Sequence, residues 1–265
     1  ICIIIFIMIV NKIHFVIDES IRDTRFQKKV LKKYKSYNAK NSDVIVVVGG
    51  DGFMLETLKK YHKYKKPFYG INKGTFGFLM NKSKIKNLKK NIMKSKPVSV
   101  SPLQMKTTSK SGTKKFAIAI NEVSLLRQSR QAASLQIISG KKILIKKLIC
   151  DGVLVCTPAG STAYNLSVGG PILSLNSKKI AVTAISPFRP RRWSGKIVPA
   201  STPIKIKNLN LKKRSVSVVA DNVEIRNIKK VYVSMQNKVK FKLLYDKKNS
   251  LNEKIKIEQI INKKF

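Results

Sequence analysis

The sequence is poor in the residues that build disulfides, metal sites and histidine-based catalysis. Its 265 residues include three cysteines and two histidines. Cys2, Cys150 and Cys156 form no CxxC pair and lie in apolar runs. This pattern fits buried thiols in a reducing compartment better than a disulfide framework or a zinc site. His14 and His62 each lack a second ligand at metal-binding spacing, so we expect neither a protein-held metal nor a histidine-based nucleophile.

Acidic residues are also scarce. There are 13 Asp and Glu against 55 Lys and Arg, which gives a formal net charge of +42. Such an excess attracts polyanions through counterion release. The lysines, however, occur on nearly every expected element, in pairs such as Lys28-Lys29 and Lys212-Lys213. We interpret them as solvated helix faces and strand edges of a sequence with biased composition, and we expect no specific nucleic-acid partner.

Long apolar runs are absent after the first ten residues. That run, residues 1–10, is too short to span a membrane and has no basic region before it, which disfavours a secreted protein. We expect a cytoplasmic protein that makes no membrane contact. Because the sequence begins without Met and Met8 precedes a strand-like stretch, we also expect residues 1–7 to lie upstream of the natural start.

The first third of the sequence is typical of an α/β domain. Strand and helix signals alternate, and the strand-like stretch 43–48, which is apolar from Val44 onward, favours a parallel strand covered on both faces. The expected elements are strands at 12–17, 43–48 and 67–71 and helices at 20–37 and 53–64. We predict an N-terminal α/β domain with a parallel sheet and helices over residues 1–96, to which the last segment, 239–265, could return.

From residue 97 the pattern changes to many short strand-like runs. The only helix signal there lies at 162–168. We place the boundary at Lys96-Pro97 and predict a mainly β second domain over residues 97–238.

A glycine-rich motif closes the apolar run 43–48 and opens a helix-like stretch. It consists of Gly49, Gly50, Asp51 and Gly52. Such glycines let backbone N–H groups approach a polyphosphate, and the following helix N-terminus adds free donors. A carboxylate beside phosphates repels them unless a metal intervenes or it takes a proton from an attacking hydroxyl, so the motif indicates phosphoryl transfer. A plainer interpretation stays open, in which Asp51 caps the helix and the glycines make the turn.

A second polar stretch follows the apolar run 152–156. Residues 157–167 turn through a Pro-Ala-Gly sequence and enter a helix at Ser161 or Thr162, which again presents N–H groups beside hydroxyls. In the alternative interpretation Ser161 is only an N-cap and Tyr164 is a core ring with its hydroxyl at the rim.

Taken together, these motifs resemble those of the NAD kinase family, whose members phosphorylate the adenosine 2′-hydroxyl of NAD to make NADP. Four blocks occur in family order and span most of the chain. They are residues 49–52, then 70–79, then Asn121-Glu122, and finally Asp151-Gly152 with 157–165. The first block is shared with lipid kinases and phosphofructokinases, whereas the four in this order are highly specific. Residues 121–127 and 188–193 further resemble the alphaproteobacterial branch.

The resemblance implies a role for each motif. Asp51 matches the family's proton acceptor for the 2′-hydroxyl, and the glycines around it match its phosphate-holding loop. Asn121 is expected on the adenine edge and Glu122 near the ribose hydroxyls, where a carboxylate accepts hydrogen bonds and rejects a substrate that is already phosphorylated. The other expected pocket residues are Phe78, against the adenine face, and Asp151, Ala159, Thr162, Ala163, Tyr164, Asn165, Leu166, Ser167 and Asn222.

The resemblance also implies the family's two-domain fold, with a substrate-binding second domain. The expected substrates are NAD, held between the domains, and ATP with Mg²⁺ or another divalent metal. Catalysis would lie mainly in alignment and charge neutralisation, with general-base help of about 10²–10⁴-fold. A homodimer or homotetramer is expected as well.

The chain departs from the family pattern in two places. Many relatives have a His and an Arg-Pro pair where this chain has residues 188–193, so the contacts of that loop do not carry over. Its arginines and Trp193 could grip phosphate or stack on a base, although an interface or core-edge loop is the favoured interpretation. The family's frequent Asp-Gly turn appears as Asp221-Asn222.

Two other functions remain as alternatives. A lipid kinase of the diacylglycerol or sphingosine type shares the first motif, but it would need an apolar channel, against which the polar Asn121-Glu122 pair argues. A non-catalytic polyanion-binding protein would follow from the charge alone, with steep salt dependence and no nucleotide turnover.

Overall fold

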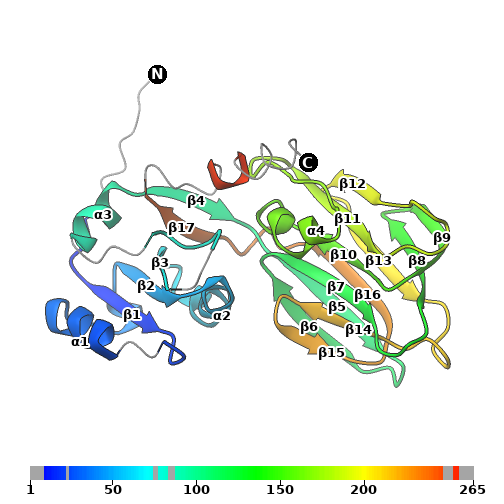
Figure 1. Ribbon diagram of the computed structural model, residues 1–265, viewed down its shortest axis with the longest axis horizontal. Coiled ribbons are helices and arrows are strands. Elements are labelled where there is room, and N and C mark those ends of the chain that lie inside the picture. The colour runs from blue at the N-terminus through cyan, green and yellow to red at the C-terminus, as the bar shows by residue number, and fades with distance from the viewer. Residues whose placement is uncertain (1–8, 22–23, 74–76, 83–86, 247–252, 257–265) are drawn as a thin grey trace. The chain divides into compact units, whose positions relative to one another are not determined.

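The computed structural model describes residues 9–21, 24–73, 77–82, 87–246 and 253–256 (Figure 1). The chain divides into two compact units. The first takes the chain up to Val100 and again from Phe241, and the second takes Ser101 to Lys240. Cys2, the start expected at Met8, and residues 74–76 of the second motif block lie outside the described residues.

The first unit is built on one five-stranded sheet. In spatial order its strands are β1 (Ile13–Ile17), β2 (Val44–Gly49), β3 (Phe68–Asn72), β17 (Phe241–Tyr245) and β4 (Lys96–Val100). The first four are parallel to their neighbours, and β4 is antiparallel to β17. The helices are α1 (Thr24–Lys33), α2 (Asp51–Tyr61) and α3 (Leu88–Lys94), with 3₁₀ turns η1 (Ala39–Asn41) and η2 (His62–Tyr64).

Burial explains why β2 lies inside this sheet. All six of its residues are buried, and they are Val, Ile or Gly, so the strand has no polar side chain to present to water. Its alternate residues Val44, Val46 and Val48 belong to one hydrophobic cluster with Tyr69 and Leu244. β2 ends at Gly49 and α2 begins at Asp51, so the glycine-rich motif lies at the carboxyl end of parallel strands.

The second unit consists of two six-stranded antiparallel sheets. One has the order β12 (Gly195–Pro199), β11 (Lys179–Ile185), β10 (Gly152–Cys156), β7 (Glu122–Arg127), β14 (Val216–Ala220) and β15 (Val223–Ile225). The other has the order β6 (Lys114–Ala119), β5 (Leu103–Ser109), β16 (Ile228–Met235), β13 (Ile204–Asn208), β8 (Ala133–Ser139) and β9 (Lys142–Cys150). The 3₁₀ turn η3 (Ala159–Thr162) and the short helix α4 (Tyr164–Ser167) follow β10.

One hydrophobic core joins the two sheets of the second unit. It contains Val153 and Val218 from the first sheet together with Met105, Ile206 and Val231 from the second, so the sheets pack face to face. The sequence prediction of a parallel α/β domain followed by a mainly β domain is thereby confirmed. None of the described helices combines the length and apolarity needed to cross a membrane.

The two described cysteines are free and buried, as predicted. Burial raises the pKa of the Cys150 and Cys156 thiols to about 12. Both thiols are therefore protonated near neutral pH and poor nucleophiles.

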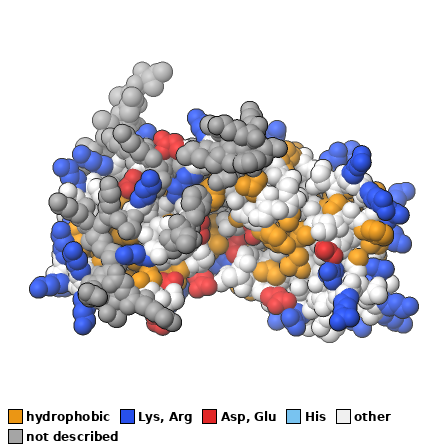
Figure 2. All heavy atoms as spheres, in the orientation of Figure 1, with side chains coloured by type: hydrophobic (Ala, Val, Ile, Leu, Met, Phe, Trp, Pro, Cys, Tyr) orange, Lys and Arg blue, Asp and Glu red, His pale blue; other side chains and the backbone are white. Residues whose placement is uncertain are grey.

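Many basic side chains, unlike the thiols, lie on the surface. Figure 2 shows Lys and Arg groups scattered over one face of the described surface, among polar and apolar groups.

Candidate functional site

Asp51 begins α2 but does not cap it. The N-cap is Gly50, and no side chain caps this helix end. The Asp51 carboxylate instead accepts hydrogen bonds from the backbone N–H of Phe78 at 2.7 Å and of Leu79 at 3.0 Å. The helix-cap interpretation of Asp51 is therefore wrong, and the carboxylate is held by a segment that follows β3.

The glycines around Asp51 fall into two groups. A Cβ on Gly49 would lie 2.8 Å from Phe53 Cδ1, and one on Gly77 would lie 2.7 Å from Asp51 Oδ1. These two glycines are needed for packing. Apart from its chain neighbours and the helix backbone, a Cβ on Gly50 or Gly52 would meet no atom of the described residues within 4 Å. Open space therefore borders the first turn of α2, where backbone N–H groups have no partner within the helix.

The environment of Asp51 suits a proton acceptor. Burial raises the pKa of its carboxyl above the ordinary value, while the N–H groups of Phe78 and Leu79 and the ammonium of Lys254 oppose part of that rise. A higher pKa makes the carboxylate a stronger base, and the hydrogen bonds fix its orientation. Sequence patterns identified Asp51 and Phe78 but gave no sign of Lys254.

In the second unit, Asn121 and Glu122 are positioned by Asp221. The Asp221 carboxylate accepts the N–H of Ile120 at 2.8 Å, of Asn121 at 2.9 Å and of Glu122 at 3.3 Å. Asp221 lies in the two-residue turn between β14 and β15, with φ at 52°, a left-handed conformation that Asp tolerates. Sequence reasoning singled out the exposed Asn222 in this turn but missed Asp221.

The turn after β10 packs directly on Asn121. The Thr157 N–H donates to Asn121 O at 2.9 Å, and Thr157 Oγ1 donates to Ile120 O at 2.7 Å. A Cβ on Gly160 would lie 2.2 Å from Asn121 O, so only glycine allows this approach. The structure thus brings Asn121 and Glu122 next to the turn that carries the buried Ala159.

The polar residues of this turn have different surroundings. Ser161 is not an N-cap, because its Oγ donates to Pro158 O and accepts the N–H of Leu173. Asn165 is fully buried; its amide donates to Ser161 O and accepts from Thr183 Oγ1. The hydroxyl of Thr162 is buried and has no hydrogen-bond partner among the described residues. Polar groups therefore shape this turn, and the buried Thr162 hydroxyl keeps its hydrogen-bonding capacity unused among the described residues.

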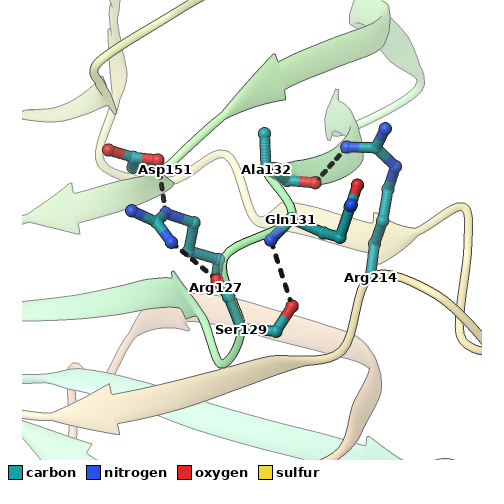
Figure 3. Close-up of polar contacts among 6 residues, drawn as sticks. All are labelled: Arg127, Ser129, Gln131, Ala132, Asp151 and Arg214. Atoms are coloured by element: carbon teal, nitrogen blue, oxygen red, sulfur yellow. Dashed lines mark hydrogen bonds and ion pairs between the residues drawn. The ribbon is translucent and has the colours of Figure 1, made fainter.

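Asp151 and Tyr164 line one cavity of about 610 Å³ in the second unit, with Arg127, Arg130 and Ile185. Tyr164 is 38% exposed, so it is not the core ring of the alternative interpretation. The Arg127 guanidinium holds Asp151, since its Nε donates to Asp151 Oδ1 at 2.5 Å while Nη1 donates to the Ser129 carbonyl (Figure 3). The pair orients the carboxylate at the cavity wall.

Three more of the expected residues lie beside these groups. Ala163 and Leu166 are partly buried on either side of Tyr164, and Ser167 is exposed at the end of α4.

In the loop at 188–193, Trp193 packs against the core of the second unit. Phe188 is 56% exposed, with the Arg189 guanidinium 4.9 Å from its ring centre. The role of this loop stays a prediction.

Acidic groups do not gather into a resident metal site in the described part of the chain. No three His, Cys, Asp or Glu side chains there are close enough to hold an ion. Both Asp51 oxygens accept backbone N–H groups, and such a carboxylate retains lone pairs for one further partner. The donor set therefore fits a divalent ion that arrives on nucleotide phosphates better than one caged by protein ligands.

Comparison with known proteins agrees with the motifs. The family model of the ATP-NAD kinase N-terminal domain matches residues 10–95, and that of the ATP-NAD kinase C-terminal domain matches residues 120–244. The chain is 42% identical to an NAD kinase of Brucella suis biovar 1 over 93% of this chain and 96% of the relative. It is 46% identical to an NAD kinase of Hyphomonas neptunium over 86% of this chain and 89% of the relative.

Solved structures show the same fold at low identity. Yeast NADH kinase, crystallised with NADH, matches with a TM-score of 0.79 and 20% identity, over 96% of this chain and 88% of that one. An NAD kinase from Archaeoglobus fulgidus, in complex with ATP, matches with a TM-score of 0.72 and 21% identity, over 94% of this chain and 99% of that one.

Proposed function

Because the chain belongs to the NAD kinase family, as its 42% identity over 93% of its length shows, we propose that Asp51 is the general base of its reaction. The protein is a phosphotransferase that makes NADP from NAD. In the proposed step, the 2′-hydroxyl oxygen of the adenosine ribose attacks the γ-phosphorus of ATP. An O–P bond forms, the bond from the γ-phosphorus to the leaving oxygen breaks, and Asp51 takes the hydroxyl proton while ADP departs.

One observation carries this assignment. Asp51 stands between Gly50 and Gly52 in the first turn of α2, and the N–H groups of Phe78 and Leu79 fix the orientation of its carboxylate. Burial raises its pKa, which favours proton uptake during the reaction. The N–H groups of the first turn of α2 would hold the phosphates, which otherwise would be repelled by the carboxylate.

In the second unit, we assign the nucleoside contacts to Asn121 and Glu122. The Asn121 amide has both a donor and an acceptor for the adenine edge, and the Glu122 carboxylate accepts from ribose hydroxyls. The turn at Ala159 and Thr162, the cavity at Asp151 and Tyr164, and the residues from Ala163 to Ser167 would complete the NAD pocket. Asn222 would contact substrate. Phe78 belongs to the first unit, and its ring would stack on an adenine face.

A divalent metal, Mg²⁺ for example, would enter with ATP and neutralise charge on the transferred phosphoryl group. Asp51 is the one acidic residue within the motif 49–52, and its carboxylate would face that ion as well as the hydroxyl. The remaining work of the chain is to align the two substrates and to exclude water. A homo-oligomer is proposed on the family resemblance alone.

The direct test is NADP formation from NAD and Mg-ATP by the purified chain, with an NADP-specific dehydrogenase as readout. We expect turnover that saturates with both substrates. A folded chain that makes no NADP but phosphorylates diacylglycerol or sphingosine would refute the proposal. So would binding to polyanions without any nucleotide turnover.

The open space at Gly52 gives a prediction that separates folding from binding. Gly52→Ala adds a Cβ that, beyond the helix backbone and its chain neighbours, meets no described residue within 4 Å. The position is helical, and there Ala is favoured over Gly by about 1 kcal/mol. The free energy of unfolding should therefore not fall. If phosphates lie there, KM for NAD or ATP should rise at least tenfold, roughly the effect of losing about 1.4 kcal/mol of binding.

Two further variants control this experiment. Gly49→Ala forces a Cβ to 2.8 Å from Phe53 Cδ1 and should lower the free energy of unfolding by about 1–3 kcal/mol. Lys60→Ala, at an exposed position in the last turn of α2, should change neither quantity. Unchanged KM values in Gly52→Ala would contradict the assignment of phosphates to this space.

A further inference from the structure

Lys254 binds the segment that holds Asp51. It lies in the short helical stretch 253–256 and belongs to the first unit. Its Nζ donates hydrogen bonds to the carbonyl oxygens of Gly77 at 2.7 Å, Phe78 at 3.2 Å and Met80 at 2.5 Å. An ammonium has three protons, so these three carbonyls use its entire donor capacity. Its position is therefore not that of a phosphate-binding lysine.

The same segment is bound from its other side by the candidate base. The N–H groups of Phe78 and Leu79 donate to Asp51, while the carbonyls of Gly77, Phe78 and Met80 accept from Lys254. One stretch of backbone thus connects the two charged groups. Without the ammonium, three partly buried carbonyls would lose a charged donor, and the N–H groups would no longer be fixed in place.

A second contact ties the end of β17 to the same region. The buried Asn81 side chain donates to Leu244 O and accepts the N–H of Asp246, both at 2.9 Å. The Tyr69 hydroxyl in turn donates to Asp246 Oδ1 at 2.8 Å. Both ends of the segment from Gly77 to Asn81 are therefore attached to chain that follows Phe241.

We propose that Lys254 is a positioning residue for phosphoryl transfer, which fixes the segment 77–80 so that its N–H groups hold the Asp51 carboxylate in one orientation. The inference rests on the proposed function of Asp51. Lys254 itself touches neither substrate nor the transferred group; it acts through the backbone that contacts the base. Its loss should therefore lower kcat with little change in KM.

The charged surroundings give this role a pH dependence. Burial has the largest effect on the pKa of Lys254 and lowers it, so that this pKa lies at about 8. Asp51 on α2 and Asp246 after β17 act in the opposite direction and raise this pKa, while the nearby Lys82 lowers it. The ring of Tyr245 lies 5.8 Å from Nζ. As pH rises through about 8, the ammonium loses its charge and one of its three donors. The alignment of Asp51 should weaken over that range.

Four variants test the proposal. Lys254→Met removes charge and donors, Lys254→Gln keeps donors without charge, and Lys254→Arg keeps both in a group that does not titrate near pH 8. Lys256→Met changes an exposed lysine of the same helical stretch and serves as the matched control. The quantities to measure are kcat, KM for NAD and ATP, and the dependence of kcat on pH.

We expect kcat of Lys254→Met to fall about 10²-fold, as for a displaced catalytic group, with KM values close to those of the unchanged chain. The acidic limb of its pH profile should also move to higher pH. Removing the ammonium raises the pKa of Asp51, and the base works only when deprotonated. The kcat of Lys254→Gln should lie between those of Lys254→Met and Lys254→Arg. Lys254→Arg should recover most of kcat and lack the decline above about pH 8.

A second measurement does not depend on turnover. Hydrogen exchange at the Phe78 and Leu79 amides should be faster in Lys254→Met than in Lys256→Met. Unchanged kcat and unchanged exchange in Lys254→Met would overturn the inference, as would equal effects of the two substitutions. If the unchanged chain makes no NADP while Lys254→Met still exchanges faster at these amides, the proposed function fails and the backbone contact stands.

Discussion

Asp51→Asn is expected to lower kcat by about 10²–10⁴-fold, the range that a general base contributes. The amide of Asn has no basic lone pair of comparable strength, so it cannot take the proton of the attacking hydroxyl. KM for both substrates should change much less than kcat, because the open space beside Gly50 and Gly52 is unaltered. The measurement is NADP formation by the two proteins at saturating NAD and Mg-ATP.

The pH dependence of the unchanged chain should identify the same group. Burial raises the pKa of Asp51, and a general base acts only when deprotonated, so kcat/KM should fall on acidification through a pKa above the ordinary carboxyl value. The residual activity of Asp51→Asn should lack this acidic limb. If both proteins lose kcat/KM over the same acidic pH range, the loss is due to a group other than Asp51.

The free energy of unfolding should change little in Asp51→Asn. Its Oδ1 can still accept one of the two backbone N–H groups, and the neutral amide avoids the cost of burying a charge. Asp43→Asn is a suitable control, because the Asp43 carboxylate likewise accepts two backbone N–H groups, those of Asn11 and Lys12. It should leave kcat unchanged. Full turnover by a folded Asp51→Asn protein would refute the assignment of the base.

The second large effect is expected for Asp221→Gly. Glycine accepts the left-handed conformation at this position, with φ at 52°, so the substitution removes the carboxylate without adding backbone strain. It leaves the N–H groups of Ile120, Asn121 and Glu122 without their acceptor. We expect the free energy of unfolding to fall by about 3 kcal/mol and KM for NAD to rise, because Asn121 and Glu122 lose their support.

The single tryptophan makes this stability measurement specific. Trp193 packs against the core of the second unit, so its fluorescence during urea unfolding reports on that unit. Asp221→Asn keeps one acceptor oxygen, so its free energy of unfolding should lie between those of Asp221→Gly and the unsubstituted protein. Glu224→Ala should cost no more than about 1 kcal/mol, because the Glu224 carboxylate forms an exposed ion pair with Arg226. Equal losses in Asp221→Gly and Glu224→Ala would show that Asp221 does not support the turn.

The class of fold could be predicted because it depends on local patterns. The apolar run of β2 and its glycine-rich end are visible in the sequence, and so is the change to short alternating strands after β4. The placement of β17 between β3 and β4 could not be specified, since a strand of five residues carries no information about its neighbours.

The sequence could indicate candidate site residues where the residue type itself suits a chemical role. Asp51, Asn121 and Glu122 belong to motifs whose residue types suit their chemistry. The groups that orient them, Asp221 and Lys254, act on backbone N–H and C=O groups, which every residue has and which leave no trace in the sequence. Asp221 lies 100 residues from Asn121, and Lys254 lies 176 residues from Phe78. Only the folded chain shows these pairings.

The position of β17 has a consequence for the order in which the chain folds during synthesis. Residues 101–240 leave the ribosome before Phe241, yet β17 is an interior strand of the first sheet, and its Phe241 and Leu243 are buried there. Until β17 emerges, β3 and β4 present unpaired edges. The sheet of the first unit therefore stays incomplete while the whole second unit is translated. That sheet is completed last, although its first strand is the nearest to the N-terminus.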